Sequence, residues 1–115
     1  MMTLLLVDDS PAFRAIARQA LGAAFRIVGE ATDGAEALKL ARSLAPDVVL
    51  LDVQLPVIDG VDVARVLAAG DDRPAVIFTS SLERRDIDPL LDGSMALGFI
   101  PKESLSVAAM LAFLS

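Results

Sequence analysis

The segment VVLLDVQLP at residues 48–56 decides the fold of this chain. It starts with four branched apolar residues, and Pro46 and Pro56 lie on either side of them. A run this short, bounded by turn residues, is typical of a strand that is apolar on both faces and lies in the middle of a parallel sheet. Open α/β sheets bind their ligands at the carboxyl ends of their strands. Asp52, which ends this strand, is therefore the first candidate for a functional residue.

Four other short apolar segments predict further strands, at residues 4–7, 25–31, 74–78 and 98–101. Apolar residues at a spacing of three and four predict helices between and after them, and the pattern at residues 86–96 is the weakest because Pro89 and Gly93 interrupt it. Strand and helix alternate five times. This alternation predicts an α/β fold with a five-stranded parallel sheet, doubly wound, and helices on both faces.

The helices also have predicted starts and predicted buried faces. Ser10 followed by Pro11 is typical of an N-cap and a first helical position, and Ser104 or Ser106 is expected to cap the last helix. In the first helix the residues expected to share one apolar face are Phe13, Ile16, Ala17, Ala20 and Leu21. In the helix after Asp59-Gly60 the expected apolar residues are Val63, Val66 and Leu67.

The composition excludes several classes of protein. We expect a single domain over residues 1–115, a length that suffices for a hydrophobic core. The absence of cysteine and histidine excludes disulfides, thiolate or imidazole metal sites and a Ser-His-Asp triad. A net charge of −6 without a basic stripe argues against direct binding of nucleic acid. We also expect neither a secretion signal nor a membrane span, and therefore a cytoplasmic protein.

Several polar residues stand at the carboxyl ends of the predicted strands. Asp8 and Asp9 follow the first strand, Asp52 ends the central one, and Thr79 and Lys102 follow the last two. Parallel strands end at one edge of a sheet, so these side chains are expected to converge. Three carboxylates at close range repel one another unless their pKa values shift or a cation binds. An open site that offers only oxygen ligands suits Mg²⁺ better than Ca²⁺, so Mg²⁺ is the expected cofactor.

Each of these residues alone also has an ordinary structural interpretation. Asp8 and Asp9 could cap a helix, Asp52 could be a loop carboxylate, Thr79 a strand-end hydroxyl and Lys102 a solvated charge. Their convergence favours a site instead. A carboxylate, a hydroxyl and an ammonium beside a metal ion are typical of phosphoryl transfer, with Asp52 as the in-line nucleophile and an acyl phosphate as the product.

The motifs that carry these residues resemble those of the receiver domains of two-component response regulators. The similarity covers nearly the whole chain, through LVDD at 6–9, LLD at 50–52, LPVIDG at 55–60, FTS at 78–80 and FIPK at 99–102. The resemblance implies a flavodoxin-like fold and a domain that accepts a phosphoryl group from a sensor histidine kinase in a Mg²⁺-dependent reaction. It implies that the domain is not an enzyme, apart from its own autophosphorylation and autodephosphorylation. It also implies that phosphorylation changes surface contacts and so controls a partner or an output domain.

The resemblance also assigns a role to each matching position. Asp9 is implied as a direct metal ligand, and Asp8 as a second ligand that binds directly or through water. The implied sites are, for the metal, Asp8, Asp9, Asp52 and the backbone carbonyl of Gln54; for the phosphoryl group, Asp52, Thr79 and Lys102; and for the switch, Thr79 and Phe99.

Two positions depart from the family pattern. Ser80 stands where the family usually has alanine, and Pro101-Lys102 replaces the commoner Lys-Pro order. Neither change removes an atom that the phosphorylation chemistry needs. Both bear on the coupling between Thr79 and Phe99, because the Ser80 hydroxyl offers a competing hydrogen bond and Pro101 denies the last strand one N–H.

Two other classes of function remain as alternatives. A haloacid-dehalogenase-type enzyme also uses an aspartyl nucleophile, but it needs a second aspartate two positions later, where this chain has Gln54. A phosphorylation-independent, receiver-like interaction module would have a degenerate site, and the intact set of polar residues argues against it. Phosphate incorporation distinguishes these alternatives.

The last helix has a property that the family resemblance does not explain. No charged residue occurs between Ser104 and Ser115. We expect one side of this helix to cover the core, with Val107, Met110, Leu111 and Leu114. The other side is expected to be an apolar outer face that docks a partner, a second copy or a following domain. Phe113 is expected to be its anchor, with Leu105, Ala108, Ala109 and Ala112 around it. The alternatives are an Ala-rich face without a partner and a chain that has been cut short.

Overall fold

The computed structural model describes residues 1–81, 89 and 95–114. Its five strands are β1 (Thr3–Val7), β2 (Arg26–Ala31), β3 (Val48–Asp52), β4 (Ala75–Ser80) and β5 (Gly98–Pro101). They pair in parallel in the order β2-β1-β3-β4-β5, so β3 is the central strand. This is the order of flavodoxin-like sheets. The predicted five-stranded parallel sheet is confirmed.

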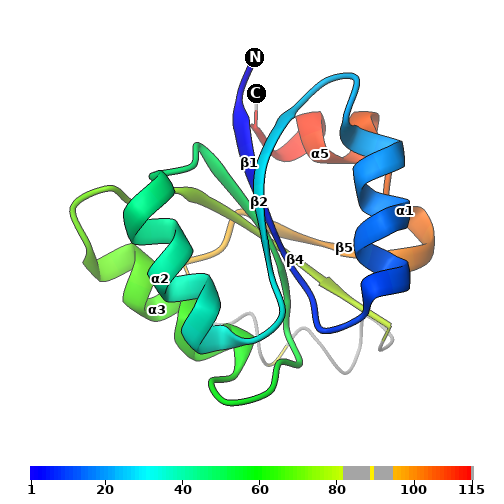
Figure 1. The fold of residues 1–115 in the computed structure, drawn as a ribbon. Helices are drawn as coiled ribbons and strands as arrows, with labels where there is room; N and C mark the ends of the chain where they lie inside the picture. The colour runs from blue at the N-terminus through cyan, green and yellow to red at the C-terminus, as the bar shows by residue number, and fades with distance from the viewer. Residues whose placement is uncertain (82–88, 90–94, 115) are drawn as a thin grey trace.

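Helices cover both faces of the sheet, as predicted. Figure 1 shows α1 (Pro11–Leu21) and α5 (Val107–Leu114) on one face, and α2 (Gly34–Leu44) and α3 (Gly60–Ala69) on the other. A short 3₁₀ helix, η1 (Lys102–Ser104), follows β5. The helix predicted at residues 86–96 lies largely outside the described residues. Within the described part of the chain, no helix is both long and apolar enough to cross a membrane.

The central strand separates two hydrophobic clusters. All five residues of β3 are buried. Val48 and Leu50 pack in the cluster beneath α1 and α5, whereas Val49 and Leu51 pack in the cluster beneath α2 and α3. Burial of a valine or leucine side chain contributes roughly 1.5–3 kcal/mol to stability. Because side chains alternate along a strand, Asp52 is placed on the α1 and α5 side of the sheet.

Side-chain caps position the helix starts next to the strand ends. The Ser10 hydroxyl accepts a hydrogen bond from the Phe13 N–H at 3.2 Å, which confirms the predicted N-cap of α1. Of the two serines considered for the last helix, Ser106 is the cap, because its hydroxyl accepts a hydrogen bond from the Ala109 N–H at 3.0 Å.

Gly60 allows α3 to start directly against the end of the central strand. Its N–H donates to the Val53 carbonyl oxygen at 3.0 Å. A Cβ atom at this position would overlap the backbone carbonyl oxygen of Asp52. A side chain at residue 60 would therefore push either the helix or the candidate nucleophile out of place.

In α1 and α3, one residue each that was predicted to face the core is instead exposed. Ile16 of α1 is 58% exposed and Val66 of α3 is 50% exposed. The buried face of α1 runs through Phe13, Ala17 and Leu21, at a spacing of four residues. This buried face is narrower than the apolar face predicted from a spacing of three and four residues. Ile16 therefore falls at the edge of the buried face.

The prediction for the last helix was right for Met110, which is buried, and wrong for Leu111 and Phe113. Phe113 packs against the cluster beneath α1 and α5, and its ring fills the space beside Gly98 where a Cβ would otherwise lie. Leu111, predicted to cover the core, is 42% exposed. Met110 is the fully buried residue of α5, and Phe113 lies three positions further on the same side. Phe113 is therefore a partly buried residue that packs against the core, and it is not the anchor of an exposed surface.

Val57, in the loop between β3 and α3, has an unusual backbone conformation. Its φ angle is 71°, in the left-handed region, and its side chain is 77% exposed. This conformation costs an L-residue roughly 1–2 kcal/mol, and a branched side chain makes it less favourable still. The exposed side chain recovers little of that cost by packing.

We expect Val57→Gly to stabilise the protein by about 0.5–1 kcal/mol, because glycine relieves the strain but adds entropy to the unfolded chain. Urea unfolding measures the difference. Val66→Gly is a matched control, since it removes a similarly exposed valine from a helix and should destabilise. Equal destabilisation by both substitutions would show that residue 57 carries no such strain.

Candidate functional site

The candidate site lies where the strands end. Asp8 follows β1, Asp52 is the last residue of β3, Thr79 is near the end of β4, and Lys102 follows β5. Asp52 and Thr79 are direct partners in the ladder between β3 and β4. The sheet order places β3 between β1 and β4, which brings these separated residues to one edge.

Three carboxylates come together at this edge. Asp8, Asp9 and Asp52 each offer an oxygen atom, and these atoms all lie within 4.8 Å of one another. Asp8 is 2% exposed and Asp52 is 5% exposed, whereas Asp9 faces solvent. The donor set contains only oxygen and is open on the Asp9 side, which fits Mg²⁺ with part of its water shell retained. The predicted acidic cluster is thus present.

Lys102 pairs with the two buried carboxylates. Its Nζ atom lies 2.8 Å from Asp8 Oδ2 and 3.1 Å from Asp52 Oδ2. Burial alone would lower the pKa of the Lys102 ammonium, but Asp8 and Asp52 outweigh burial and raise the pKa above its usual range. Lys102 therefore stays charged as the counter-ion of both carboxylates.

The surroundings of Asp52 act on its pKa in both directions. Burial raises the pKa of the Asp52 carboxyl, and the nearby Asp8 carboxylate adds to this effect. The Gln54 N–H, which donates to Asp52 Oδ1 at 2.9 Å, and the Lys102 ammonium oppose it. The net result is a raised pKa. The charged form of Asp52 is thus held at a cost, because its carboxylate is buried.

Thr79 is fully buried, and its hydroxyl has no hydrogen-bond partner among the residues that the structure describes. Leaving a buried hydroxyl without a partner costs roughly 1–3 kcal/mol. Phe99 is 3% exposed and lies opposite Phe78 in the ladder between β4 and β5. Thr79 is therefore a donor beside Asp52 that is free to bind a further acceptor, and Phe99 is one strand away.

The two departures from the family pattern are neighbours in space. Ser80 and Pro101 are partners in the ladder between β4 and β5. Because proline lacks an N–H group, Pro101 removes one donor at the point where the ladder ends. Ser80 directly follows Thr79 in the chain, and Pro101 directly precedes Lys102, so each departure adjoins a residue of the candidate site.

Phe13 contributes to the site in a way that the sequence did not indicate. The Lys102 Nζ atom lies 4.8 Å from the centroid of the Phe13 ring, within the range of a cation–π interaction. The apolar pattern of α1 predicted that Phe13 faces the sheet. It contained no signal that the ring meets the end of β5 rather than only aliphatic side chains.

Comparison with known proteins agrees with this geometry. Residues 4–112 match the family described as the response regulator receiver domain. A protein-glutamate methylesterase/protein-glutamine glutaminase of Pseudoalteromonas atlantica is 36% identical over 110 residues, which are 92% of this chain and 29% of that protein. The chain thus spans less than a third of the length of this relative.

Solved structures show the same fold. The signal receiver domain of NarL from Mycobacterium tuberculosis superposes with a TM-score of 0.88 and 34% identity, over 96% of this chain and 94% of that one. The response regulator domain of Thermotoga maritima CheB has a TM-score of 0.80 and 27% identity, over 99% of this chain and 89% of that one.

Proposed function

This chain belongs to the response regulator receiver domain family, and on that premise we propose that it accepts a phosphoryl group on Asp52 from the phosphohistidine of a sensor histidine kinase. The observation that carries the proposal is the position of Asp52. It ends the central strand, beside two further carboxylates and within 3.1 Å of the Lys102 ammonium.

The residues around Asp52 support a direct transfer. An Asp52 carboxylate oxygen forms a bond to phosphorus while the bond between phosphorus and the kinase histidine nitrogen breaks, and that nitrogen keeps the electron pair. Lys102 stabilises the negative charge on the phosphoryl oxygens. The unpartnered Thr79 hydroxyl donates a hydrogen bond to one of them. The product is an aspartyl phosphate.

The acidic cluster is proposed as the metal site for this reaction. Asp8, Asp9 and Asp52, with the backbone carbonyl of Gln54, are the groups that would hold Mg²⁺. The bound ion supplies further neutralisation of the phosphoryl oxygens.

We propose that phosphorylation acts as a switch for a partner or an output domain in the cytoplasm. The hydrogen bond that Thr79 donates to the phosphoryl group draws Thr79 toward Asp52, and Phe99 reorients in response. The domain carries out no chemistry on other substrates. The relatives with methylesterase names are more than three times as long as the matched region, so any output activity belongs to sequence outside it.

Mass spectrometry after incubation with acetyl phosphate and Mg²⁺ tests the proposal. We expect one phosphoryl group per chain, located in the peptide that contains Asp52, and no incorporation when EDTA removes the metal. Failure of the wild-type chain to incorporate phosphate under these conditions would favour the phosphorylation-independent interaction module.

Mg²⁺ is also expected to stabilise the protein, because it offsets the repulsion among Asp8, Asp9 and Asp52. The expected gain is about 2.7 kcal/mol when free Mg²⁺ exceeds its Kd a hundredfold. Thermal unfolding with and without Mg²⁺ measures it. Asp9→Ala should remove most of the gain, whereas Asp62→Ala, at an exposed position of α3, should leave it unchanged. An unmoved wild-type melting curve at millimolar Mg²⁺ contradicts the metal site.

A further inference from the structure

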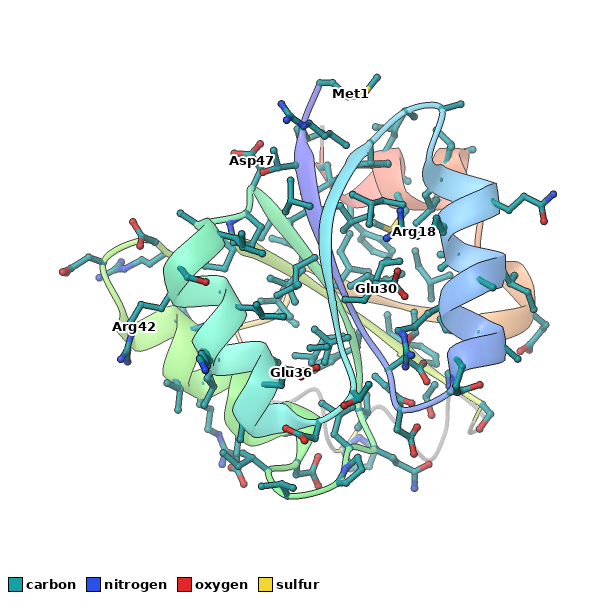
Figure 2. All side chains as sticks on the ribbon, in the orientation of Figure 1. Met1, Arg18, Glu30, Glu36, Arg42 and Asp47 are labelled. Carbon is teal, nitrogen blue, oxygen red and sulfur yellow. The ribbon has the colours of Figure 1, made fainter. Side chains whose placement is uncertain are left out.

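Two arginines of α1 share one carboxylate on the neighbouring edge strand. Arg14 Nε donates to Glu30 Oε1 at 3.0 Å, and Arg18 Nη2 donates to Glu30 Oε2 at 2.6 Å. The hydrogen bond from Arg18 is the main cause that lowers the pKa of Glu30. Figure 2 shows Arg18 and Glu30 in the space between β2 and α1. The two arginines are therefore similar in charge and in their partner.

Of the two side chains, only that of Arg14 makes a hydrogen bond to a second residue among those that the structure describes, and this bond reaches the candidate site. Its Nη1 atom donates to the backbone carbonyl oxygen of Asp8 at 2.6 Å. The Arg14 side chain is 15% exposed, whereas the Arg18 side chain is 52% exposed. Arg14 thus links Glu30 to the turn that carries the acidic residues, and Arg18 does not.

The Asp8 carbonyl is a sensitive point of this turn. The carbonyl of residue 8 and the N–H of residue 9 belong to one rigid peptide plane. A hydrogen bond to the carbonyl therefore fixes the direction in which Asp9 leaves the strand. The other groups of Asp8 are also held, because its N–H donates to Ala31 at 3.0 Å and its Oδ1 accepts from Ser10 at 2.9 Å.

We propose that Arg14 is a positioning residue that holds the Asp8–Asp9 peptide in the orientation needed to bind a divalent cation, a role that rests on the proposed function of the acidic cluster. Glu30 holds the guanidinium in place from the other side. The cation gains affinity because Asp8 and Asp9 are already in position before it binds.

A pure charge effect and a positioning role of Arg14 predict opposite changes in Mg²⁺ affinity when Arg14 is replaced. Removal of a positive charge near three carboxylates strengthens cation binding if electrostatics alone matters. Removal of a group that orients ligands weakens binding, typically by about tenfold or more. The direction of the change therefore distinguishes a positioning role from a simple charge effect.

The experiment is a Mg²⁺ titration monitored by NMR of the backbone amides. It compares the wild-type chain with Arg14→Met, Arg14→Lys and Arg18→Met. Arg14→Met and Arg18→Met lose the same charge and the same partner, so Arg18→Met is the matched control. We expect about tenfold weaker binding for Arg14→Met, with little change for Arg18→Met. Arg14→Lys keeps the charge but has one terminal nitrogen, so it is also expected to bind Mg²⁺ more weakly.

A measurement without metal provides a second readout. In Mg²⁺-free protein, the amide shifts of residues 8 and 9 should change in both Arg14 variants and stay unchanged in Arg18→Met. The positioning role is overturned if Arg14→Met binds Mg²⁺ as tightly as the wild type or more tightly. If Arg14→Met does not fold, unchanged Mg²⁺ binding by Arg14→Lys overturns it instead. A wild-type chain that does not bind Mg²⁺ overturns the proposed metal site as well, so the two failures are distinguishable.

Discussion

Asp52→Asn is expected to abolish phosphate incorporation from both acetyl phosphate and a phosphorylated histidine kinase. The asparagine amide has nearly the same shape as the carboxylate, so the packing at the end of β3 should persist. Its nitrogen and oxygen are poor nucleophiles at phosphorus. The measurement is the phosphorylated fraction by mass spectrometry, and the expected fraction is below detection.

The control for this substitution is Asp59→Asn. Asp59 caps α3 and is exposed, with its carboxylate accepting a hydrogen bond from the Val61 N–H at 3.3 Å. Asparagine is an equally good N-cap. Asp59→Asn should therefore leave both the phosphorylation level and the fold unchanged. Phosphate found on Asp8, Asp9 or Asp59 in the Asp52→Asn chain would overturn the choice of acceptor.

Lys102→Met is expected to have the largest effect on stability. It leaves the buried carboxylates of Asp8 and Asp52 without their counter-ion, while methionine still fills the space above the Phe13 ring. Removing one partner of a buried ion pair costs roughly 3–5 kcal/mol. The open side of this site reduces the expected loss to about 2–3 kcal/mol without metal. Phosphorylation should fall as well, because the phosphoryl oxygens lose a counter-charge.

The loss should depend on pH in a defined direction. Burial already raises the pKa of Asp52, and Lys102 opposes that rise. Without Lys102, the Asp52 carboxyl keeps its proton to a higher pH in the folded state than in the unfolded state. Below the pKa that Asp52 has in the unfolded chain, the variant keeps its full stability. As the pH rises through the higher pKa that Asp52 has in the folded variant, this stability is lost. The difference from the wild type should therefore be small in acid and grow toward neutral pH.

Urea unfolding at several pH values, with and without Mg²⁺, measures these effects. Mg²⁺ should restore most of the lost stability, because a divalent cation supplies the missing charge. Lys39→Met, at an exposed position of α2, is the control and should change little. A loss that is independent of both pH and Mg²⁺ would show that Lys102 acts through packing rather than through its charge.

The sequence predicted the sheet and the convergence of Asp8, Asp9 and Asp52 because both depend on short, strongly patterned segments. The apolar residues of β3 could form only a buried strand, and the polar residues after each strand could only meet at one edge. The same reasoning does not reach contacts made by long side chains. Arg14 lies off the apolar face of α1, as an arginine in solvent would, and only the folded chain brings its guanidinium to the Asp8 carbonyl.

The orientation of α5 could not be predicted, for a different reason. A helix is oriented by the contrast between its polar and apolar faces. Val107–Leu114 contains only apolar residues, so any rotation about the helix axis buries an apolar face. The orientation is instead set by shape, through the fit of the Phe113 ring beside Gly98.

The contact between Phe113 and Gly98 also implies a rule for sequence variation among relatives. The two positions divide one fixed volume between the start of β5 and the last turn of α5. A relative with a side chain at the position of Gly98 is expected to carry a smaller residue at the position of Phe113, and the two positions should covary. Where a large residue stands at both positions, the last helix is expected to lie farther from β5. That strand carries Phe99 and leads to Lys102, so the change would occur beside the candidate site.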